Sequence, residues 1–367
     1  MRSGMERKLA SLQIINSLSP IDNADRIELA KVLGWQVVVK KDEFKVGDLI
    51  IYCEIDSLLP EKPEFEFLRP RRFRIKSMKL KGVLSQGIIF SIDFLPEEVK
   101  RLVLTQCPGG YKELIGTDVT EKMGIIKYEP PISPQMMGKI LGDFPTHIIP
   151  KTDEIRLQSI PNILSEFANR EIYISTKMDG TSFTCYHILQ TNTEEPHKFG
   201  VCSRNLELKE DETVYWDIAH KLDLKQRLTD YFVSYKKNIA IQGEICGPGI
   251  NKNHAGLKKL SLFVFNIYDI DQQKCFNFDE LIHTAAELQL ETVPIDWVGK
   301  FDIKEFTVEK LIEMSRGKYS GTNNNREGIV IRPVCGTSSE VVSSYGGDPR
   351  RGLSTKVINN DYLLKAE

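Results

Sequence analysis

The spacing of hydrophobic residues in the first part of the chain favours short β-strands. Apolar, β-rich runs fall at 36–39, 48–54 and 82–91, and a turn at Gly47 separates the first two. Short strands separated by turns are typical of a small barrel, and an OB-like barrel is the member of that class that fits best. We therefore expect residues 1–115 to form an OB-like β-barrel domain.

The pattern changes after residue 150, where strands alternate with isolated helices. Near-helical spacing of apolar residues predicts helices at 211–237, 278–290 and 307–318. Strands are predicted at 171–176, 182–189, 199–203, 239–245, 260–270 and 328–333. This mixture indicates an α+β domain over residues 151–367. The intervening residues 116–150 are rich in proline and glycine, so we interpret them as a linker.

Composition narrows the classes of function that need consideration. The chain has 41% hydrophobic and 27% charged residues, which is typical of globular proteins, and its net charge is −2. No apolar run approaches the roughly 18 residues that a membrane helix needs, so we expect no membrane partner. The seven cysteines and six histidines form no metal-binding pattern, and scattered thiols suit a reducing compartment. We expect the cytoplasm, with the nucleus or an organelle as alternatives.

Positive charge is concentrated in one short segment of the predicted barrel. This basic segment could neutralise several phosphates of a nucleic acid, with counterion release as the driving force. The alternative is a solvated loop with no ligand. Its cations are Arg69, Arg71, Arg72, Arg74, Lys76, Lys79 and Lys81.

The tetrapeptide Lys177-Met178-Asp179-Gly180 follows a predicted strand and is the first candidate for covalent chemistry. A lysine amine is a nucleophile only when deprotonated, so its pKa must fall from about 10.4 toward about 7. Burial and nearby positive charge, including a metal ion, can lower the pKa in this way. Alone, a lysine at this place is more often an ordinary surface residue.

Further polar and aromatic residues recur on the strands that follow. Arg204 closes one strand, Glu244 lies inside an apolar strand, and Phe265 lies on an aromatic strand that could stack on a flat base. Glu327 begins a strand and Lys356 comes near the end of the chain. Each has an ordinary interpretation as a salt-bridged strand end, a core aromatic or a surface lysine. Their order along the chain is the unusual feature.

In this order the residues resemble the motifs of the lysine-dependent nucleotidyltransferases, which include polynucleotide ligases and mRNA capping enzymes. The matching segments are motif I at 177–180, motif Ia at 203–205, motif III at 242–244, motif IIIa at 263–267, motif IV at 327–331 and motif V at 356–357. The resemblance implies that 151–367 is a ligase-type (ATP-grasp-like) nucleotidyltransferase domain of antiparallel sheets with flanking helices.

Within this superfamily, the chain is most similar to the Deinococcus-type RNA ligases. These carry an OB domain before the lysine and seal nicks in duplexes. Only eleven residues follow Lys356, so we expect no OB domain after motif V, in contrast to DNA ligases and capping enzymes. Residues 152–158 also resemble an RNA-ligase signature. A DNA ligase, a capping-type enzyme and a non-catalytic nucleic-acid-binding protein stay as alternatives.

The resemblance implies that Lys177 carries AMP during ATP-dependent joining of RNA 3′-OH and 5′-phosphate ends, by way of an RNA-adenylate. It implies that Mg²⁺ or Mn²⁺ is bound by Asp179, Glu327 and Glu244. Nucleotide contacts are expected from Arg204, Lys356, Phe265, Glu244 and, at the outer phosphates or the RNA end, Arg156. Two departures matter. Thr176 and Ser175 stand where many relatives have a glutamate, which leaves adenine selection to backbone groups, and motif V has one lysine.

Overall fold

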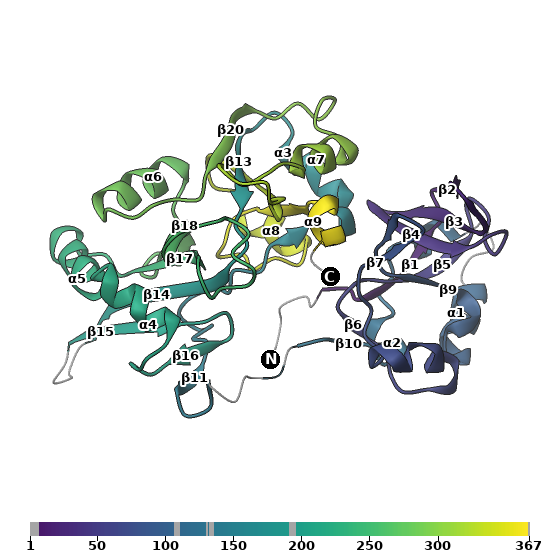
Figure 1. The fold of residues 1–367 in the computed structure, drawn as a ribbon, viewed down its shortest axis with the longest axis horizontal. Coiled ribbons are helices and arrows are strands. Elements are labelled where there is room, and N and C mark those ends of the chain that lie inside the picture. The colour runs from purple at the N-terminus through teal and green to yellow at the C-terminus, as the bar shows by residue number, and fades with distance from the viewer. Residues whose placement is uncertain (1–6, 106–110, 130, 132–135, 191–195, 366–367) are drawn as a thin grey trace. The chain divides into compact units, whose positions relative to one another are not determined.

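The computed structural model describes residues 7–105, 111–129, 131, 136–190 and 196–365. The chain divides into two compact units (Figure 1). The N-terminal unit consists mainly of residues 6–131, and the C-terminal unit consists mainly of 132–157 and 162–362. Cys107, one of the seven cysteines, lies outside the described residues.

The N-terminal unit is built almost entirely of short strands. They form a sheet of order β1-β5-β9, a sheet of order β2-β3-β4, and the two-stranded pairs β7-β8 and β10-β6. The strands are β1 (Ala10–Ile14), β2 (Ser17–Ile21), β3 (Ala24–Val32), β4 (Trp35–Lys40), β5 (Leu49–Cys53), β6 (Ser57–Leu58), β7 (Met78–Leu80), β8 (Val83–Ser85), β9 (Ile88–Ser91) and β10 (Ile126–Lys127). Two short helices are α1 (Glu97–Thr105) and α2 (Thr120–Met123).

The predicted strands at 36–39 and 48–54 are confirmed as β4 and β5. The prediction of one strand over 82–91 was wrong, because the chain breaks between β8 and β9 at Gly87. Gly87 has φ +91°, and a Cβ atom there would lie 2.6 Å from the carbonyl oxygen of Cys53. A residue with a side chain is disfavoured on both counts, so glycine turns the chain where a continuous strand would clash.

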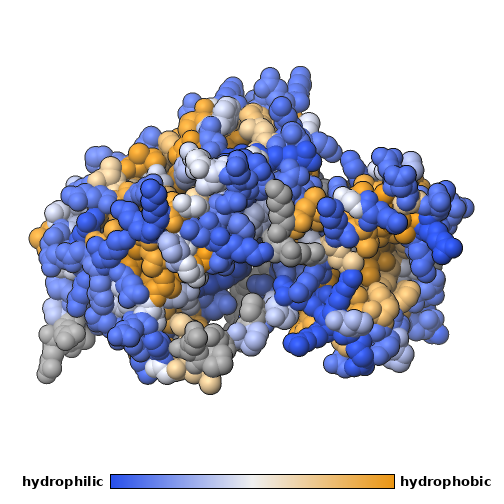
Figure 2. All heavy atoms as spheres, viewed as in Figure 1, coloured by the Kyte–Doolittle hydropathy of each residue, from blue (hydrophilic) through white to orange (hydrophobic). Residues whose placement is uncertain are grey.

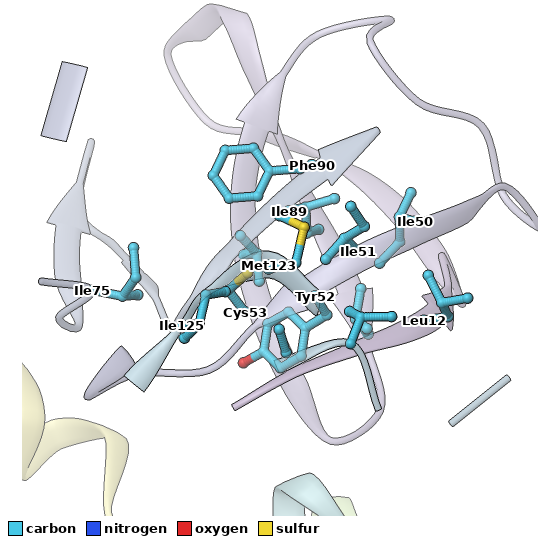
Figure 3. Packing of buried hydrophobic residues seen from close by; sticks show 14 of the residues in the cluster. Leu12, Ile50, Ile51, Tyr52, Cys53, Ile75, Ile89, Phe90, Met123 and Ile125 are labelled. Atoms are coloured by element: carbon cyan, nitrogen blue, oxygen red, sulfur yellow. The ribbon is translucent and has the colours of Figure 1, made fainter. Parts of the chain in front are cut away.

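One hydrophobic core fills the N-terminal unit (Figure 3). Leu12 from β1, Ile51 from β5 and Phe90 from β9 are all buried in it. Met123 and Ile125 join the same core. Proline and glycine content had predicted a linker from residue 116 onward, yet this part of the segment packs inside the barrel and adds β10 to β6.

The C-terminal unit contains two larger sheets and several helices. Its strands are β11 (Ile140–Asp143), β12 (Ile155–Arg156), β13 (Glu171–Lys177), β14 (Thr181–Leu189), β15 (His197–Cys202), β16 (Leu206–Leu208), β17 (Ile239–Cys246), β18 (Ser261–Asp269), β19 (Lys274–Cys275), β20 (Ile295–Lys300), β21 (Gly328–Pro333) and β22 (Thr355–Ile358). Its helices are α3 (Leu164–Phe167), α4 (Val214–Lys221), α5 (Leu224–Tyr235), α6 (Phe278–Glu287), α7 (Val308–Ser315) and α8 (Ser339–Ser344). A further helix, α9 (Asn360–Lys365), follows β22.

Seven strands form one sheet of order β11-β16-β15-β14-β17-β18-β19, and five form a second of order β12-β22-β21-β13-β20. Helices α4 and α5 pack beside β15 and β14, and α6 packs beside β18 (Figure 1). Leu224, Leu228 and Leu281 on these helices are buried against the seven-stranded sheet. The helices therefore cover the larger sheet with their apolar sides.

The predicted helix over 211–237 is two helices, α4 and α5. Asp223 lies between them with φ 51°, a left-handed conformation that a continuing α-helix cannot include. Helix α6 begins with a capping box in which the Asn277 side chain accepts a hydrogen bond from the backbone N–H of Glu280. Helices α6 and α7 confirm the predicted helices at 278–290 and 307–318 in shorter form.

Hydrophilic side chains dominate the visible surface of each unit (Figure 2). Large hydrophobic residues that are exposed, such as Val46, Ile126 and Val298, come from widely separated segments. Among the residues that the structure describes, no helix is both long enough and apolar enough to cross a membrane.

Candidate active site

The Lys177–Gly180 segment connects the two sheets of the C-terminal unit. Strand β13 belongs to the five-stranded sheet and ends at Lys177, whereas β14 belongs to the seven-stranded sheet and begins at Thr181. The chain must therefore turn sharply between them. A Cβ atom on Gly180 would lie 2.2 Å from the carbonyl oxygen of Ile245, so glycine allows this turn to lie close against β17.

A pocket of about 250 Å³ lies beside this turn and receives side chains from both sheets. It contains most of the residues that the sequence analysis had selected for nucleotide chemistry. The lining residues include Lys177, Arg204, Glu244, Phe265 and Lys356, together with Thr152, Asp153, Glu154, Ser175, Thr176, Met178, Gly180, Thr181, Ser182, Val293, Val330 and Arg332. Residues as far apart in the chain as Thr152 and Lys356 thus meet at one cavity.

Phe265 faces the pocket at an irregularity in β18. Gln242 pairs with Asn266 and the next residue, Gly243, pairs with Val264, so Phe265 has no residue opposite it on β17. One extra residue on a strand is a β-bulge, and bulges re-aim side chains next to binding sites. Phe265 is half-buried, so an aromatic face is available in the pocket.

The Nζ atom of Lys177 lies 2.8 Å from Oε2 of Glu327, and it donates a hydrogen bond to that carboxylate. Burial lowers the pKa of Lys177, but the charges of Glu327, Glu244 and Asp179 outweigh burial and raise the pKa above its ordinary value. The lowered pKa expected from the sequence is therefore absent from the ligand-free state. The reason is that acidic groups, rather than positive charges, surround this lysine.

Glu244 lies on β17 within the same group of acids. Burial raises the pKa of Glu244 to about 7; the ammonium of Lys177 opposes this shift, and the nearby Glu327 and Asp179 reinforce it. A carboxyl group poised in this way can carry a proton in the ligand-free state and lose it when positive charge enters the pocket.

Asp179 is held by residues that the sequence did not predict, among them Asn251 and His254. The side-chain amide of Asn251 donates to Oδ1 of Asp179 at 2.7 Å, and His254 pairs with Oδ2. Both partners lie in the loop after β17, more than 70 positions from Asp179, and no spacing in the sequence links them. The side chain of Asp179 is only 7% exposed, so these contacts fix its orientation.

Lys356 is a half-buried lysine with cationic neighbours. Strand β12 runs parallel to β22 and pairs Arg156 with Lys356. Burial lowers the pKa of Lys356 to about 7, and the positive charges of Arg156 and Lys177 contribute to this shift. The structure thus brings Arg156 next to the predicted phosphate-binding lysine, although Arg156 does not itself line the pocket. A site that suppresses the charge of a lysine in this way can gain strongly from an anionic ligand.

A buried ion cluster forms one wall of the pocket. Glu154, whose side chain is 8% exposed, accepts hydrogen bonds from Arg332 at 2.6 Å and from Arg351 at 2.9 Å, and Ser354 donates to it as well. Burial raises the pKa of Glu154, but the two arginines outweigh it and hold the pKa well below its usual range. The guanidinium of Arg332 also lies 5.6 Å from the centre of the Phe265 ring. Glu154 lies within the 152–158 segment that resembles an RNA-ligase signature.

The predicted metal ligands can be compared with what Mg²⁺ or Mn²⁺ requires. Among the described residues, no group of three or more histidine, cysteine, aspartate or glutamate side chains is arranged to hold an ion unaided. Mg²⁺ commonly uses one or two carboxylates, with substrate phosphates and waters as further ligands. Glu327 and Glu244 suit such a site. Both oxygens of Asp179 are already engaged by Asn251 and His254, so Asp179 fits an indirect contact through water better.

The basic segment of the N-terminal unit is only partly available for a ligand. Arg69 pairs with Glu66 and Glu61, and Arg74 lies 2.8 Å from Asp56 and over the ring of Tyr128. The other five cations are exposed, and within the described part of the chain no carboxylate forms an ion pair with them. They are Arg71, Arg72, Lys76, Lys79 and Lys81.

Comparison with known families matches both units. An OB-fold domain model matches residues 9–92, and an RNA ligase model matches residues 170–345. No curated protein matches the chain.

Solved structures of an RNA ligase from Naegleria gruberi match 98% of the chain. One, determined with pyrophosphate, is 32% identical with a TM-score of 0.76, and the match covers 98% of each chain. A glutamate-to-alanine mutant with AMP and Mn is 32% identical with a TM-score of 0.77, and a lysine-to-alanine mutant with ATP and Mn is 31% identical with a TM-score of 0.77. Both of these matches cover 98% of this chain and 99% of the other. The chain therefore belongs to the RNA ligase family, with an OB-fold domain followed by a ligase nucleotidyltransferase domain.

Proposed function

We propose that this RNA ligase uses ATP and a divalent cation, and that it forms a covalent intermediate with AMP on Lys177. The observation that carries the proposal is the pocket beside Lys177, which combines a nucleophile, three further cations, three carboxylates and an aromatic ring. The Naegleria relatives bind ATP, AMP and Mn, which supports the same ligands here. Phosphoryl transfer depends mainly on positioning and charge neutralisation, and these side chains can supply both.

The reaction proceeds in three steps, and each step forms one bond to phosphorus and breaks another. The Lys177 amine attacks the α-phosphorus of ATP, the bond to the bridging oxygen breaks, and pyrophosphate leaves. An oxygen of the RNA 5′-phosphate then attacks the same phosphorus and releases Lys177, which gives an RNA-adenylate. The RNA 3′-OH finally attacks the activated 5′-phosphate, forms the phosphodiester bond and releases AMP.

Residues of this chain control the first step, the transfer of AMP from ATP to Lys177. Lys177 is held as an ammonium by Glu327 at 2.8 Å, so this pair must open and the ammonium must lose its proton before the amine can attack. Glu327 and Glu244 would hold the cation, with Asp179 acting on its waters. When bound, Mg²⁺ or Mn²⁺ neutralises charge on the phosphates of ATP.

The other pocket residues divide between the base, the ribose and the phosphates. Phe265 would stack on adenine, because its bulge turns the ring into the cavity. Glu244 would contact the ribose in addition to the cation. Lys356 and Arg204 would contact phosphates, with Arg156 reaching the outer phosphates or the RNA end.

We further propose that the substrate is a nick in an RNA-containing duplex with 3′-OH and 5′-phosphate ends, as in the Deinococcus-type enzymes. The OB-fold domain, mainly residues 6–131, would bind the duplex backbone through the basic segment, while the C-terminal unit performs the chemistry. Free buried thiols such as Cys185 and Cys202 support a reducing compartment, and we propose the cytoplasm.

Transfer of label from α-labelled ATP tests the proposal. The intact protein with Mg²⁺ or Mn²⁺ should retain labelled AMP through denaturation, and peptide mapping should locate it on Lys177. Lys177→Ala should abolish the label, whereas Lys225→Ala, which removes an exposed lysine on α5, should not. Label from GTP alone would indicate a capping-type enzyme, and efficient sealing of an all-DNA nick would indicate a DNA ligase. No label with any nucleotide would leave only a nucleic-acid-binding protein.

A further inference from the structure

A single tyrosine hydroxyl joins the main chains of the two residues that form the ion pair in the pocket. The hydroxyl of Tyr319 donates a hydrogen bond to the carbonyl oxygen of Lys177 at 3.0 Å, and it accepts one from the backbone N–H of Glu327 at 3.1 Å. Tyr319 is not among the residues that line the pocket. It therefore contacts the proposed nucleophile and its carboxylate partner through their main chains, without contact to the nucleotide site.

The strand pairing explains why these two backbone groups need a side-chain partner. Strand β13 pairs with β21 as far as Lys177, which lies opposite Gly328. The ladder stops there, because the chain leaves β13 after Lys177 and turns toward β14 in the other sheet. A ladder that continued would supply partners from the facing strand. The Tyr319 hydroxyl supplies them instead, so the carbonyl group of Lys177 and the N–H group of Glu327 stay paired.

The place of the hydroxyl is fixed by the packing of its ring and by the loop that carries it. Tyr319 is 5% exposed and belongs to a hydrophobic cluster that includes Met178 and Phe263. The loop between α7 and β21 is closed by a hydrogen bond of 3.0 Å from the backbone N–H of Arg326 to the carbonyl oxygen of Gly317. Burial raises the pKa of Tyr319, so the hydroxyl keeps the proton that it donates.

The main chain of Glu327 is held on its other side as well. Its carbonyl oxygen accepts a hydrogen bond from the backbone N–H of Asn359 at 2.9 Å, and the side-chain amide of Asn359 donates to the carbonyl oxygen of Arg326 at 2.9 Å. With its N–H fixed by Tyr319 and its carbonyl group by Asn359, Glu327 keeps freedom only in its side chain. That side chain reaches the Nζ atom of Lys177 at 2.8 Å.

We propose that Tyr319 is a positioning residue that holds the main chains of Lys177 and Glu327 at the separation that AMP transfer requires. This inference rests on the proposed transfer of AMP to Lys177. A misplacement of about 1 Å can slow a reaction roughly a hundredfold, because attack needs the reacting atoms close together and aligned. Tyr319 makes no contact in the pocket, so its hydroxyl should affect the rate of transfer and leave the affinity for the nucleotide unchanged.

Tyr319→Phe tests the proposal, because it removes the hydroxyl and keeps the ring in its cluster. The rate of AMP transfer to the full chain, at saturating ATP with Mn²⁺, should fall about ten- to a hundredfold. Affinity is measured separately with an ATP analogue that carries a methylene group between the α- and β-phosphorus atoms and cannot transfer AMP. The equilibrium affinity of Tyr319→Phe for this analogue should stay within about twofold of the wild-type value.

Tyr345→Phe is the matched control. The hydroxyl of Tyr345 donates to Oε1 of Glu166 at 3.0 Å in the same unit, and neither residue lines the pocket. Each substitution removes a hydrogen bond of a tyrosine hydroxyl, so each should lower the thermal midpoint measured without nucleotide. Only Tyr319→Phe should slow AMP transfer when the rates are compared at a temperature at which all three proteins are folded.

The outcomes separate the positioning role from the proposed function. If the wild type and Tyr319→Phe accept AMP at the same rate, the positioning role is refuted and the proposed function stands. A loss of affinity for the analogue as large as the loss of rate would also refute it, because the hydroxyl would then shape the whole pocket. Equal slowing in Tyr345→Phe would assign the effect to lost stability. A wild-type protein that accepts no AMP from ATP would refute the proposed function itself.

Discussion

At the scale of single residues, Lys356 is the group whose charge depends most directly on the nucleotide. Its pKa of about 7 leaves it largely neutral at pH 8 in the ligand-free protein. ATP phosphates would favour the ammonium form, so binding at pH 8 should take up a proton, and this uptake should shrink below pH 7, where Lys356 is already charged. Calorimetry of ATP binding in two buffers of different ionisation enthalpy measures the uptake.

Lys356→Met serves as the comparison, since Lys177 and Glu244 can also exchange protons on binding. The variant should take up fewer protons than the wild type at pH 8, and equal uptake would contradict the assignment. A lysine whose pKa is lower in the folded than in the unfolded state also favours unfolding as protons are added. The free energy of unfolding therefore decreases as the pH falls from about 10.4, the ordinary pKa of lysine, toward about 7, the pKa of Lys356 in the folded protein.

Glu154 offers a second prediction at this scale. Removal of its carboxylate in Glu154→Ala would leave Arg332 and Arg351 as buried charges without their anion, which should destabilise the protein by about 3–5 kcal/mol. Urea unfolding measures the change, with Glu340→Ala as the control because Glu340 is an exposed acid on α8. A loss below about 1 kcal/mol would mean that solvent or other groups compensate the two arginines.

The sequence could predict some of these residues and not others, for a physical reason. Lys177, Glu244 and Phe265 lie in short local patterns on strands, and such patterns are readable from neighbours in the chain. Their placement at one pocket agrees with the prediction of a nucleotide site. Glu154 and His254 acquire their significance from partners far away in the chain, at Arg332 and Asp179. Contacts between distant segments leave no periodicity in the sequence.

At the scale of elements, the turn between β13 and β14 depends on Gly180. A methyl group there would meet the backbone oxygen of Ile245 at 2.2 Å and would push β17 away from the turn. Gly180→Ala should therefore cost about 1–3 kcal/mol of stability, the usual range for overpacking, and should strongly slow AMP transfer by displacing Glu244. Urea unfolding and labelling with ATP measure the two effects.

Gly142→Ala is the matched control for this substitution. Gly142 lies on β11 in the same unit, and a Cβ atom there would have no heavy atom within 4 Å. This variant should keep both stability and labelling. Equal behaviour of the two variants would show that the turn tolerates a side chain and that Gly180 has no steric role.

The predictions from the sequence differ most from the structure at the boundaries of elements. The run at 211–237 has continuous helical periodicity, yet Asp223 adopts a left-handed conformation and divides it into α4 and α5. Aspartate tolerates that conformation better than most residues, so its identity gives little warning. The segment after residue 116 is similar: glycine and proline predict a linker, but Met123 and Ile125 find a core that only the folded barrel supplies. Tertiary packing decided the second case.

At the scale of the whole molecule, the proposal assigns nucleotide chemistry to one unit and nucleic-acid binding to the other, so the two should be separable by mutation. Arg72→Ala and Lys79→Ala remove exposed cations that have no carboxylate partner within the described residues. Each should weaken binding of a nicked RNA duplex and reduce the slope of log affinity against log salt by about 1 if it contacts a phosphate. AMP transfer to Lys177 without RNA should be unchanged. Binding titrations at several salt concentrations, beside ATP labelling, measure both.

Arg69 gives the comparison that makes this prediction specific. Its charge is already compensated by Glu66 and Glu61, so Arg69→Ala should change duplex affinity and its salt dependence less than Arg72→Ala or Lys79→Ala does. If all three substitutions weaken binding equally, net charge alone explains the effect, and the basic segment has no defined contact with the duplex. If none of them matters, the RNA is bound elsewhere. No residue of the nucleotide pocket comes from the basic segment, so Arg72→Ala is expected to keep AMP labelling. A loss of labelling in this variant would contradict the separation of the two activities.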